Sequence, residues 1–539
     1  MVCHDDRPRK LEAVFTITGL VVVAAALLYA TSQPIIRILG DTLAMASAVK
    51  ISVVILILIG VAMCAWLWGG ARSAKAAPRT TAPVPQLVDA SAEYGKPVTR
   101  LQVRGVGITV DTLTGSEILE HLAAKAETHA SIFSSKASDY PATWTNKSSL
   151  STMRSGLALK LGAGRAVDYT PLPVFAYGPA KDPESENGAA FSIAEARQAG
   201  SLPFHLFMTQ QAVDGAGLSL ADVFRFFDEN PDAPAAIVFA RDGMVTRKLL
   251  GKPGSGLLPD TAVVPAVFDS NVALFVTCPD RVDRLRPFAV KEPGSIDTRE
   301  VQFDAVKLWN FYWDDTQAFD KHYGAEAAAH GVNAPSTPGT MTSEWWRARV
   351  PELWKQTQNK GPGEYQPTPW TPVRWTEWQL KEYDEAPVVG YLERPVQVHL
   401  ADKHGAPLRE QAQAAALREG WQRMVGTGNS VVRPARVLFD TTGNRESVIP
   451  LTQALGTEPE APSTGDVKEG YDVGYRLGNT GVTSGAVQLA LSLIAGFQDG
   501  KASAAVMRDA RGNAELVLIT PPDDLDKKRN LATDEKPFN

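Results

Sequence analysis

Cysteine is scarce in this chain of 539 residues, which contains only Cys3, Cys64 and Cys278. Cys64 lies inside an uncharged apolar block, so the sequence excludes a framework of disulfides, and the scarcity agrees with a reducing compartment. A basic excess is also missing, because 54 Lys and Arg residues face 60 Asp and Glu residues for a net charge of −6. We therefore expect no nucleic-acid partner, since binding to phosphates depends on a basic surface.

The motifs that bind metals and cofactors are missing as well. The sequence has no CxxC, no HExxH, no G-x-S-x-G and no pair of histidines at helical ligand spacing. The segment 496–501 resembles a phosphate-binding loop, but it has three residues between its glycines instead of four and follows a helix. The Gly-x-Gly pairs at 105–107 and 162–164 lack the third glycine of a dinucleotide-binding fingerprint. We expect neither a metal nor a cofactor.

Two long apolar blocks stand near the N-terminus, at residues 13–36 and 51–71, and neither contains a charge. About 20 apolar residues span the hydrocarbon core of a bilayer, so both blocks are long enough. Trp66 and Trp68 stand at the end of the second block, where an interfacial aromatic belt is expected. We predict a membrane anchor at 1–71 with transmembrane helices at about 13–33 and 51–69. The alternatives are a cleaved signal peptide for the first block and a buried hairpin of core helices for both.

Positive charges flank the pair of apolar blocks on their outer sides. The basic residues are Arg7, Arg9 and Lys10 before the first block, Arg37 and Lys50 between the blocks, and Arg72, Lys75 and Arg79 after the second. The positive-inside rule then places both termini, and the large C-terminal body, in the cytoplasm.

The rest of the chain has the pattern of an α/β protein. Residues 72–98 form a linker rich in Ala, Pro and Thr. Short apolar runs predict strands at 101–111, 235–240, 273–277, 396–400, 435–439 and 515–519, and helical spacing predicts helices at 116–126, 203–213, 408–424 and 481–497. Ser219 is the expected N-cap of a further helix, with Asp222 as its acidic partner. We predict two α/β halves at 99–300 and 395–521, a Trp/Pro-rich segment at 301–394 and a polar tail at 522–539.

The Trp/Pro-rich segment contains eight of the twelve tryptophans. Tryptophan is enriched at protein interfaces, so the segment is a candidate partner-binding surface. The residues singled out for this role are Trp345, Trp346, Trp370, Trp375 and Trp378. The alternative is that these side chains pack inside the body.

The segment LGNTGVTSGA at 477–486 leads directly into a predicted helix. It resembles the C-terminal catalytic loop of the thiolase-like condensing enzymes, the ketoacyl synthases. The resemblance implies that Gly478, Asn479 and Thr480 form an acyl-site loop in which Asn479 polarises a carbonyl. Condensation also needs a thiolate and a second polarising side chain. The stretch after 435–439 has no histidine, and Cys278 lacks a small-residue elbow, so we interpret the loop as vestigial. The alternative is that Asn479 simply caps its helix.

Longer stretches resemble a proteobacterial family of adapters for type VI secretion lipases. They are RLQVRGVGITVD at 100–111, FAYGPAKDP at 175–183, DSNVALFVTCPDRVDRLRPFA at 269–289, PWTPVRWTEWQLKEYDEAPVVGYLERPVQVHL at 369–400 and GYRLGNTGVTSGAVQLALSLIAGFQDG at 474–500. The resemblance implies a non-enzymatic protein of the bacterial inner membrane that binds a phospholipase effector and delivers it to the secretion spike. The alternatives are an acyl-binding or acyl-transfer enzyme that uses Asn479 and Cys278, and an immunity protein for the lipase.

Overall fold

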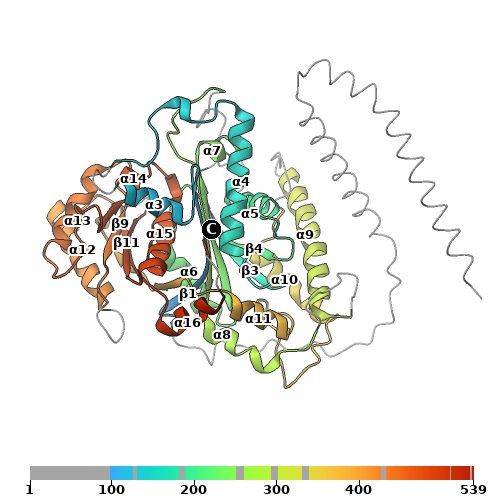
Figure 1. Cartoon of the computed structure of the whole chain (residues 1–539). Coiled ribbons are helices and arrows are strands. Elements are labelled where there is room, and N and C mark those ends of the chain that lie inside the picture. The colour runs from blue at the N-terminus through green and yellow to red at the C-terminus, as the bar shows by residue number, and fades with distance from the viewer. Residues whose placement is uncertain are drawn as a thin grey trace, which may run out of the picture. The chain divides into compact units, whose positions relative to one another are not determined.

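The computed structural model describes residues 97–539 (Figure 1), with gaps at 126–129, 181–187, 251–259, 293–301, 330–338, 427–431, 510–511, 534–536 and 539. The two N-terminal apolar blocks lie outside the described residues, so both transmembrane helices and their orientation stay predictions. Within the described part, one helical stretch, Gly481–Asp499, is long and apolar enough to cross a membrane. Most of it is buried inside the body, where it serves as a core helix.

The described residues form one mixed sheet of twelve strands. The strands are β1 (Arg100–Val110), β2 (Leu113–Thr114), β3 (Pro171–Gly178), β4 (Leu206–Asp214), β5 (Ala235–Asp242), β6 (Ser270–Thr277), β7 (Gly390–Glu393), β8 (Val396–Val398), β9 (Arg436–Phe439), β10 (Gly470–Asp472), β11 (Ser503–Arg508) and β12 (Ala514–Thr520). Their order is β10-β9-β11-β12-β7-β1-β6-β5-β3-β4, with β2 beside β1 and β8 beside β12. Pairs are parallel near both ends of this order and antiparallel in the middle.

Helices cover the sheet in layers. The helices are α3 (Ser116–Ala124), α4 (Trp144–Ala163), α5 (Gly188–Ala199), α6 (Leu220–Glu229), α7 (Met244–Leu250), α8 (Pro279–Asp283), α9 (Asp304–Ala329), α10 (Ser343–Trp354), α11 (Glu377–Glu385), α12 (Glu410–Val425), α13 (Val448–Leu455), α14 (Val473–Arg476), α15 (Ser484–Asp499) and α16 (Asp524–Thr533). Short 3₁₀ turns stand at Ala137–Asp139, Arg286–Phe288, Arg445–Ser447 and Gly481–Thr483. In Figure 1, α4 and α5 lie on one side of the strands around β1, and α3 and α15 on the other.

The central helix α15 joins the two halves of the sheet. It contacts β11 and β12 of the C-terminal half as well as β1 and β6 of the N-terminal half. Eleven of its sixteen residues are buried, so it has no polar face to present to water. Beyond β9 and β11, α12 and α13 form the outermost layer at the left of Figure 1. The main core therefore combines apolar side chains of α15 with those of the strands β1, β5 and β6.

Glycines on β1 allow α4 to approach the sheet closely. A β-carbon on Gly105 would lie 2.0 Å from the carbonyl oxygen of Gly162, and one on Gly107 would lie 1.8 Å from that of Ala158. Any side chain at these positions would push the helix away from the strand. Gly105, Gly107 and Gly162 are thus packing residues between α4 and the sheet, and Gly164 is the C-cap residue of α4.

Most of the expected elements are present near their expected positions, and Ser219 does cap α6 by accepting the backbone N–H of Asp222. The helix predicted at 203–213 is wrong, because Leu206–Asp214 is strand β4 and pairs in parallel with β3. The tail at 522–539, expected to be polar, contains α16, whose Asp526 is buried against the body.

Candidate functional site

The loop Gly478–Thr483 connects α14 to α15 and is bound to the start of β6. Asn479 Oδ1 accepts the backbone N–H of Gly481 at 2.9 Å, and its Nδ2 donates to the carbonyl oxygen of Ala266 at 3.1 Å. Thr480 is fully buried, and its carbonyl oxygen accepts the hydroxyl of Ser270 at 3.0 Å. The amide of Asn479 is therefore used in holding its own loop. Asn479 does not cap α15, because the N-cap residue of that helix is Thr483.

A buried carboxylate supports this loop from the end of β5. Asp242 accepts two hydrogen bonds of 2.8 Å from Arg247 and one of 2.9 Å from the backbone N–H of Val482. Gly481 has φ +61°, and a β-carbon there would lie 2.0 Å from Asp242 Oδ2. The glycine lets the loop backbone reach the carboxylate, which explains its place in the GNTG sequence.

An open cavity borders the loop at the carboxyl ends of β9 and β10. It holds about 400 Å³ and its lining includes Thr441, Thr442, Arg445, Tyr475 and Asn479. The Arg445 guanidinium lies 5.4 Å from the centre of the Tyr475 ring. These lining groups include no thiol, imidazole or carboxylate, which are the usual nucleophiles and general bases.

Cys278 lies far from the loop. It follows β6 directly, whereas the loop binds Ser270 at the other end of that strand. A strand of eight residues spans about 25 Å at ~3.3 Å per residue. The thiol is buried, and this burial raises its pKa to about 11. The structure therefore does not bring Cys278 and Asn479 to one acyl site, and the thiol is not activated as a nucleophile.

The five tryptophans singled out in the sequence are mostly core residues. Trp346, Trp370 and Trp375 are buried, and Trp345 and Trp378 are half-buried. The indole N–H of Trp346 donates to the Pro369 carbonyl oxygen at 2.7 Å. The packing alternative accounts for these positions. Partner binding by the tryptophans themselves stays a prediction.

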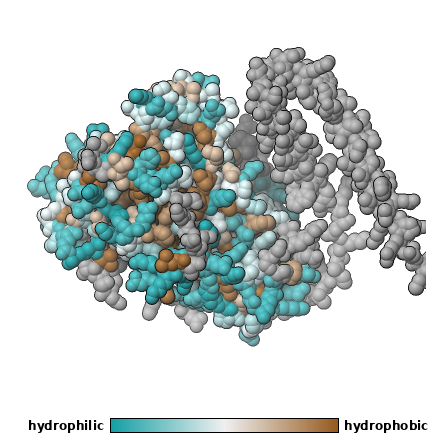
Figure 2. Space-filling model, viewed as in Figure 1, coloured by the Kyte–Doolittle hydropathy of each residue, from teal (hydrophilic) through white to brown (hydrophobic). Residues whose placement is uncertain are grey.

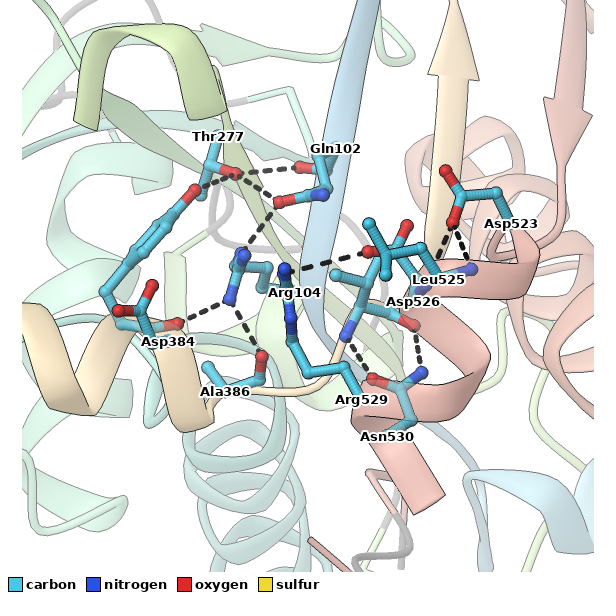
Figure 3. Close-up of polar contacts among 12 residues, drawn as sticks. Gln102, Arg104, Thr277, Asp384, Ala386, Asp523, Leu525, Asp526, Arg529 and Asn530 are labelled. Atoms are coloured by element: carbon cyan, nitrogen blue, oxygen red, sulfur yellow. Dashed lines mark hydrogen bonds and ion pairs between the residues drawn. The ribbon is translucent and has the colours of Figure 1, made fainter. Parts of the chain in front are cut away.

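A buried polar network, which no sequence motif indicated, joins β1 to α11 (Figure 3). Arg104 donates from Nε to Gln102 Oε1 at 2.7 Å and from Nη1 to the carbonyl oxygens of Tyr383 and Ala386. Those carbonyls belong to the C-terminal turn of α11, where helices leave acceptors unsatisfied. Burial lowers the pKa of the Arg104 guanidinium. Arg104 thus caps α11 from the sheet.

The same network holds the C-terminal helix α16. The hydroxyl of Tyr391 donates to Asp526 Oδ2, and Gln102 Nε2 lies 3.5 Å from that hydroxyl. The Asn530 amide donates to the Val388 carbonyl oxygen at 2.8 Å and accepts its N–H at 2.9 Å. Figure 3 shows Asp526, Arg529 and Asn530 of α16 beside Arg104 of β1. The network is a structural link between distant parts of the chain.

Two groups of carboxylates have raised pKa values. Burial raises the pKa of Asp269 to about 7, and its Oδ1 accepts no hydrogen bond from the part of the chain that the structure describes. It shares a small cavity of about 40 Å³ with Asp111 and Arg154. Burial also raises the pKa of Asp168 to about 6 and that of Glu382 to about 7. Among the described residues, no three His, Cys, Asp or Glu side chains are grouped to hold a metal ion.

Comparison with solved structures finds only distant likeness. The ishigamide ketosynthase/chain length factor is 11% identical, with a TM-score of 0.39, and the match covers 79% of this chain and all of that one. The ketosynthase from module 6 of the bacillaene synthase from Bacillus subtilis 168 is 9% identical, with a TM-score of 0.39 over 79% and 72% of the two chains. OleA of Xanthomonas campestri is 9% identical, with a TM-score of 0.36 over 79% and 100%. We draw no functional conclusion from similarity at this level.

The family comparison is decisive for the class of protein. A model of the N-terminal part of type VI lipase adapter protein Tla3 matches residues 99–261, and a model of its C-terminal part matches residues 389–521. Together the two matches cover more than half of the chain. One match lies in each half of the sheet. The protein is an α/β protein of the adapter class. It belongs to the family of type VI lipase adapter proteins Tla3.

Proposed function

We propose that this protein is a non-enzymatic adapter that binds a type VI secretion phospholipase effector and helps to load it onto the secretion spike. The observation that supports this most strongly is the match of both adapter models, one to each half of the body. An adapter needs a stable surface that recognises its partner, and it needs no reactive centre.

The geometry of the loop supports a non-enzymatic role. Asn479 is engaged in hydrogen bonds within its own loop, and Cys278 stands at the opposite end of β6. We interpret the body as a thiolase-like fold that has lost catalysis. In this interpretation the GNTG loop is retained because it joins β5, β6 and α15.

We also propose that the two N-terminal apolar blocks tether the body to the cytoplasmic face of the bacterial inner membrane. The charge pattern around the blocks supports this orientation. A tether at this place would hold the captured lipase beside the membrane-bound secretion machine.

Co-purification tests the adapter function. The full-length chain, tagged at its C-terminus, is isolated from a strain that carries the lipase and spike genes of the same secretion cluster. We expect the lipase to be retained in stoichiometric amount, and the spike protein to be enriched. A Cys278→Ala variant should retain the lipase equally well, because the proposed function uses no thiol. Loss of the lipase from the unchanged chain would contradict the proposal.

A fusion at the C-terminus tests the proposed orientation. Alkaline phosphatase is active only after export, and green fluorescent protein folds in the cytoplasm. We expect fluorescence and no phosphatase activity from the two fusions. The opposite pattern would show that the body lies outside the cytoplasm.

A further inference from the structure

The C-terminal helix α16 exposes two leucines on its outer side. Leu525 and Leu531 are 67% and 81% exposed, more than any other large hydrophobic side chain in the described part of the chain. Lys528 stands between them in the sequence and is exposed as well. Residues three apart are neighbours on a helix surface, so these three side chains form one row, which we call the α16 ridge.

Buried polar contacts fix the rotation of α16. Asp526 is 4% exposed and accepts the hydroxyl of Tyr391, and Asn530 exchanges two hydrogen bonds, of 2.9 and 2.8 Å, with the backbone of Val388. Positions four apart lie on one face of a helix, so this polar face is turned toward the body. The α16 ridge is therefore turned outward.

This arrangement is the reverse of an ordinary surface helix, which buries its apolar face and exposes its polar one. A single exposed leucine is common, and Figure 2 shows hydrophobic and hydrophilic residues interspersed over the face of the body that carries α16. Two leucines on a helix that instead buries an aspartate are a different case. The network around Asp526 in Figure 3 holds them in water, where only an external apolar phase can cover them.

The charges of α16 are separated along its length. Lys527, Lys528 and Arg529 are consecutive and exposed. The acidic residues at the surface stand before them, where Asp523 accepts two backbone N–H groups of the first turn and Asp524 lies 3.5 Å from Lys527. Leucines edged by lysine and arginine are typical of helices that lie on a bilayer with anionic headgroups.

The α16 ridge also lies near the point where the chain enters the body. The guanidinium of Arg100, the first residue of β1, lies 3.8 Å from the centre of the Tyr391 ring, and the hydroxyl of Tyr391 donates to Asp526. The predicted linker at 72–98 precedes this point. At ~3.3 Å per residue such a linker can reach about 90 Å, so the anchor alone does not decide which face of the body meets the bilayer.

We propose that the α16 ridge docks on the anionic cytoplasmic surface of the inner membrane. Leu525 and Leu531 enter the headgroup region, and the three basic side chains bind lipid phosphates. Docking holds the body in one orientation, which a flexible tether does not. The proposal rests on the membrane tether proposed above.

The test places a fluorophore on the ridge of the full-length chain. In a background of Cys3→Ser, Cys64→Ser and Cys278→Ala, Leu531→Cys is labelled with NBD, and the chain is reconstituted in nanodiscs of phosphatidylcholine and phosphatidylglycerol. We expect lipids brominated in their acyl chains to quench the fluorescence by roughly half, because an interfacial helix buries its apolar face about 5–10 Å deep. The same label at Glu419→Cys, an exposed position of α12, should not be quenched.

A matched variant tests the ridge itself. Leu525→Ser with Lys528→Glu, added to the labelled chain, should abolish the quenching and leave Tm unchanged, because both positions are exposed. Nanodiscs of phosphatidylcholine alone should also give little quenching, because each basic side chain strengthens binding to an anionic surface by about fivefold.

The outcomes separate this proposal from the tether. A chain that enters the nanodiscs but shows no quenching at 531, or the same quenching in the matched variant, would overturn the docking alone. A chain that does not enter the nanodiscs would overturn the tether and, with it, the docking. A response at 531 to added lipase but not to lipid would assign the ridge to the lipase and overturn the membrane proposal.

Discussion

The Glu515 carboxylate on β12 accepts the backbone N–H of Leu220, the first residue of α6, at 2.9 Å. The same carboxylate accepts the hydroxyl of Ser219 at 3.0 Å. A helix begins with backbone N–H groups that have no partner inside the helix, and a negative charge there also favours the helix dipole. Residues nearly 300 positions apart thus complete one helix end, and the C-terminal half stabilises the N-terminal half.

Replacing this carboxylate should weaken the whole body. We expect Glu515→Ala to lower the free energy of unfolding by about 1–3 kcal/mol, because it leaves N–H groups of α6 buried without an acceptor. Chemical denaturation followed by circular dichroism measures the change. The matched variant Glu419→Ala, on an exposed position of α12, should change stability by less than about 0.5 kcal/mol. Equal effects of the two variants would contradict the capping role.

Gly481 should tolerate no side chain. It has φ +61°, and a β-carbon there would meet Asp242 Oδ2 at 2.0 Å. We expect Gly481→Ala to lower the free energy of unfolding by about 2–4 kcal/mol through backbone strain and displacement of the carboxylate. Gly512 has φ +82° with open space around it, so Gly512→Ala should cost only the strain, about 1 kcal/mol. A difference near zero between these variants would show that the loop does not depend on the contact with Asp242.

The Asp269 carboxyl should make stability fall as the pH rises. Its pKa in the folded protein is raised to about 7 by burial, so the folded state holds a proton that the unfolded chain loses near pH 4. The stability from this group is fully present below about pH 4 and is lost as the pH rises through about 7. The free energy of unfolding of the unchanged protein should therefore decrease between pH 5 and pH 8. We expect this decrease to be about 2 kcal/mol smaller in the Asp269→Asn variant. Denaturant titrations at four pH values measure the free energy of unfolding of both proteins. The same dependence of this free energy on pH in both would contradict the prediction.

Cys278 should be unreactive while the protein is folded. Because burial raises its pKa to about 11, almost none of the thiol is ionised at pH 7.5. We expect iodoacetamide to leave the peptide that contains Cys278 unlabelled in the native protein, and to label it fully in guanidinium chloride. Mass spectrometry distinguishes this peptide from those of Cys3 and Cys64. Rapid labelling of native Cys278 would support the acyl-transfer alternative.

Local patterns in the sequence predicted a large share of the elements. The alternation in 101–111 predicted β1, and the Ser219–Asp222 pair correctly marked the start of α6. The stretch at 203–213 failed because β4 begins with the buried run Leu206–Met208, and such a run does not distinguish a strand from a buried helix by periodicity. Only its pairing with β3, a long-range contact, settles the question.

The candidate site was less visible in the sequence. The GNTG loop does lead into a helix, as predicted, but its support by Asp242 depends on two segments some 240 residues apart. The tryptophans were prominent, but composition does not reveal their burial. Trp346 is buried where α10 packs on Phe311 and Tyr312 of α9, and Trp370 is buried against Phe226 of α6.

Binding of the purified lipase to the purified full-length chain tests the central claim most directly. In isothermal titration calorimetry we expect saturable binding with a Kd in the micromolar range or tighter, which is ordinary for a specific protein pair. Mass spectrometry of the mixture should find both chains unmodified, as an adapter without chemistry requires. A titration that releases no heat and forms no complex on size exclusion, or one that leaves the lipase covalently changed, would contradict the account.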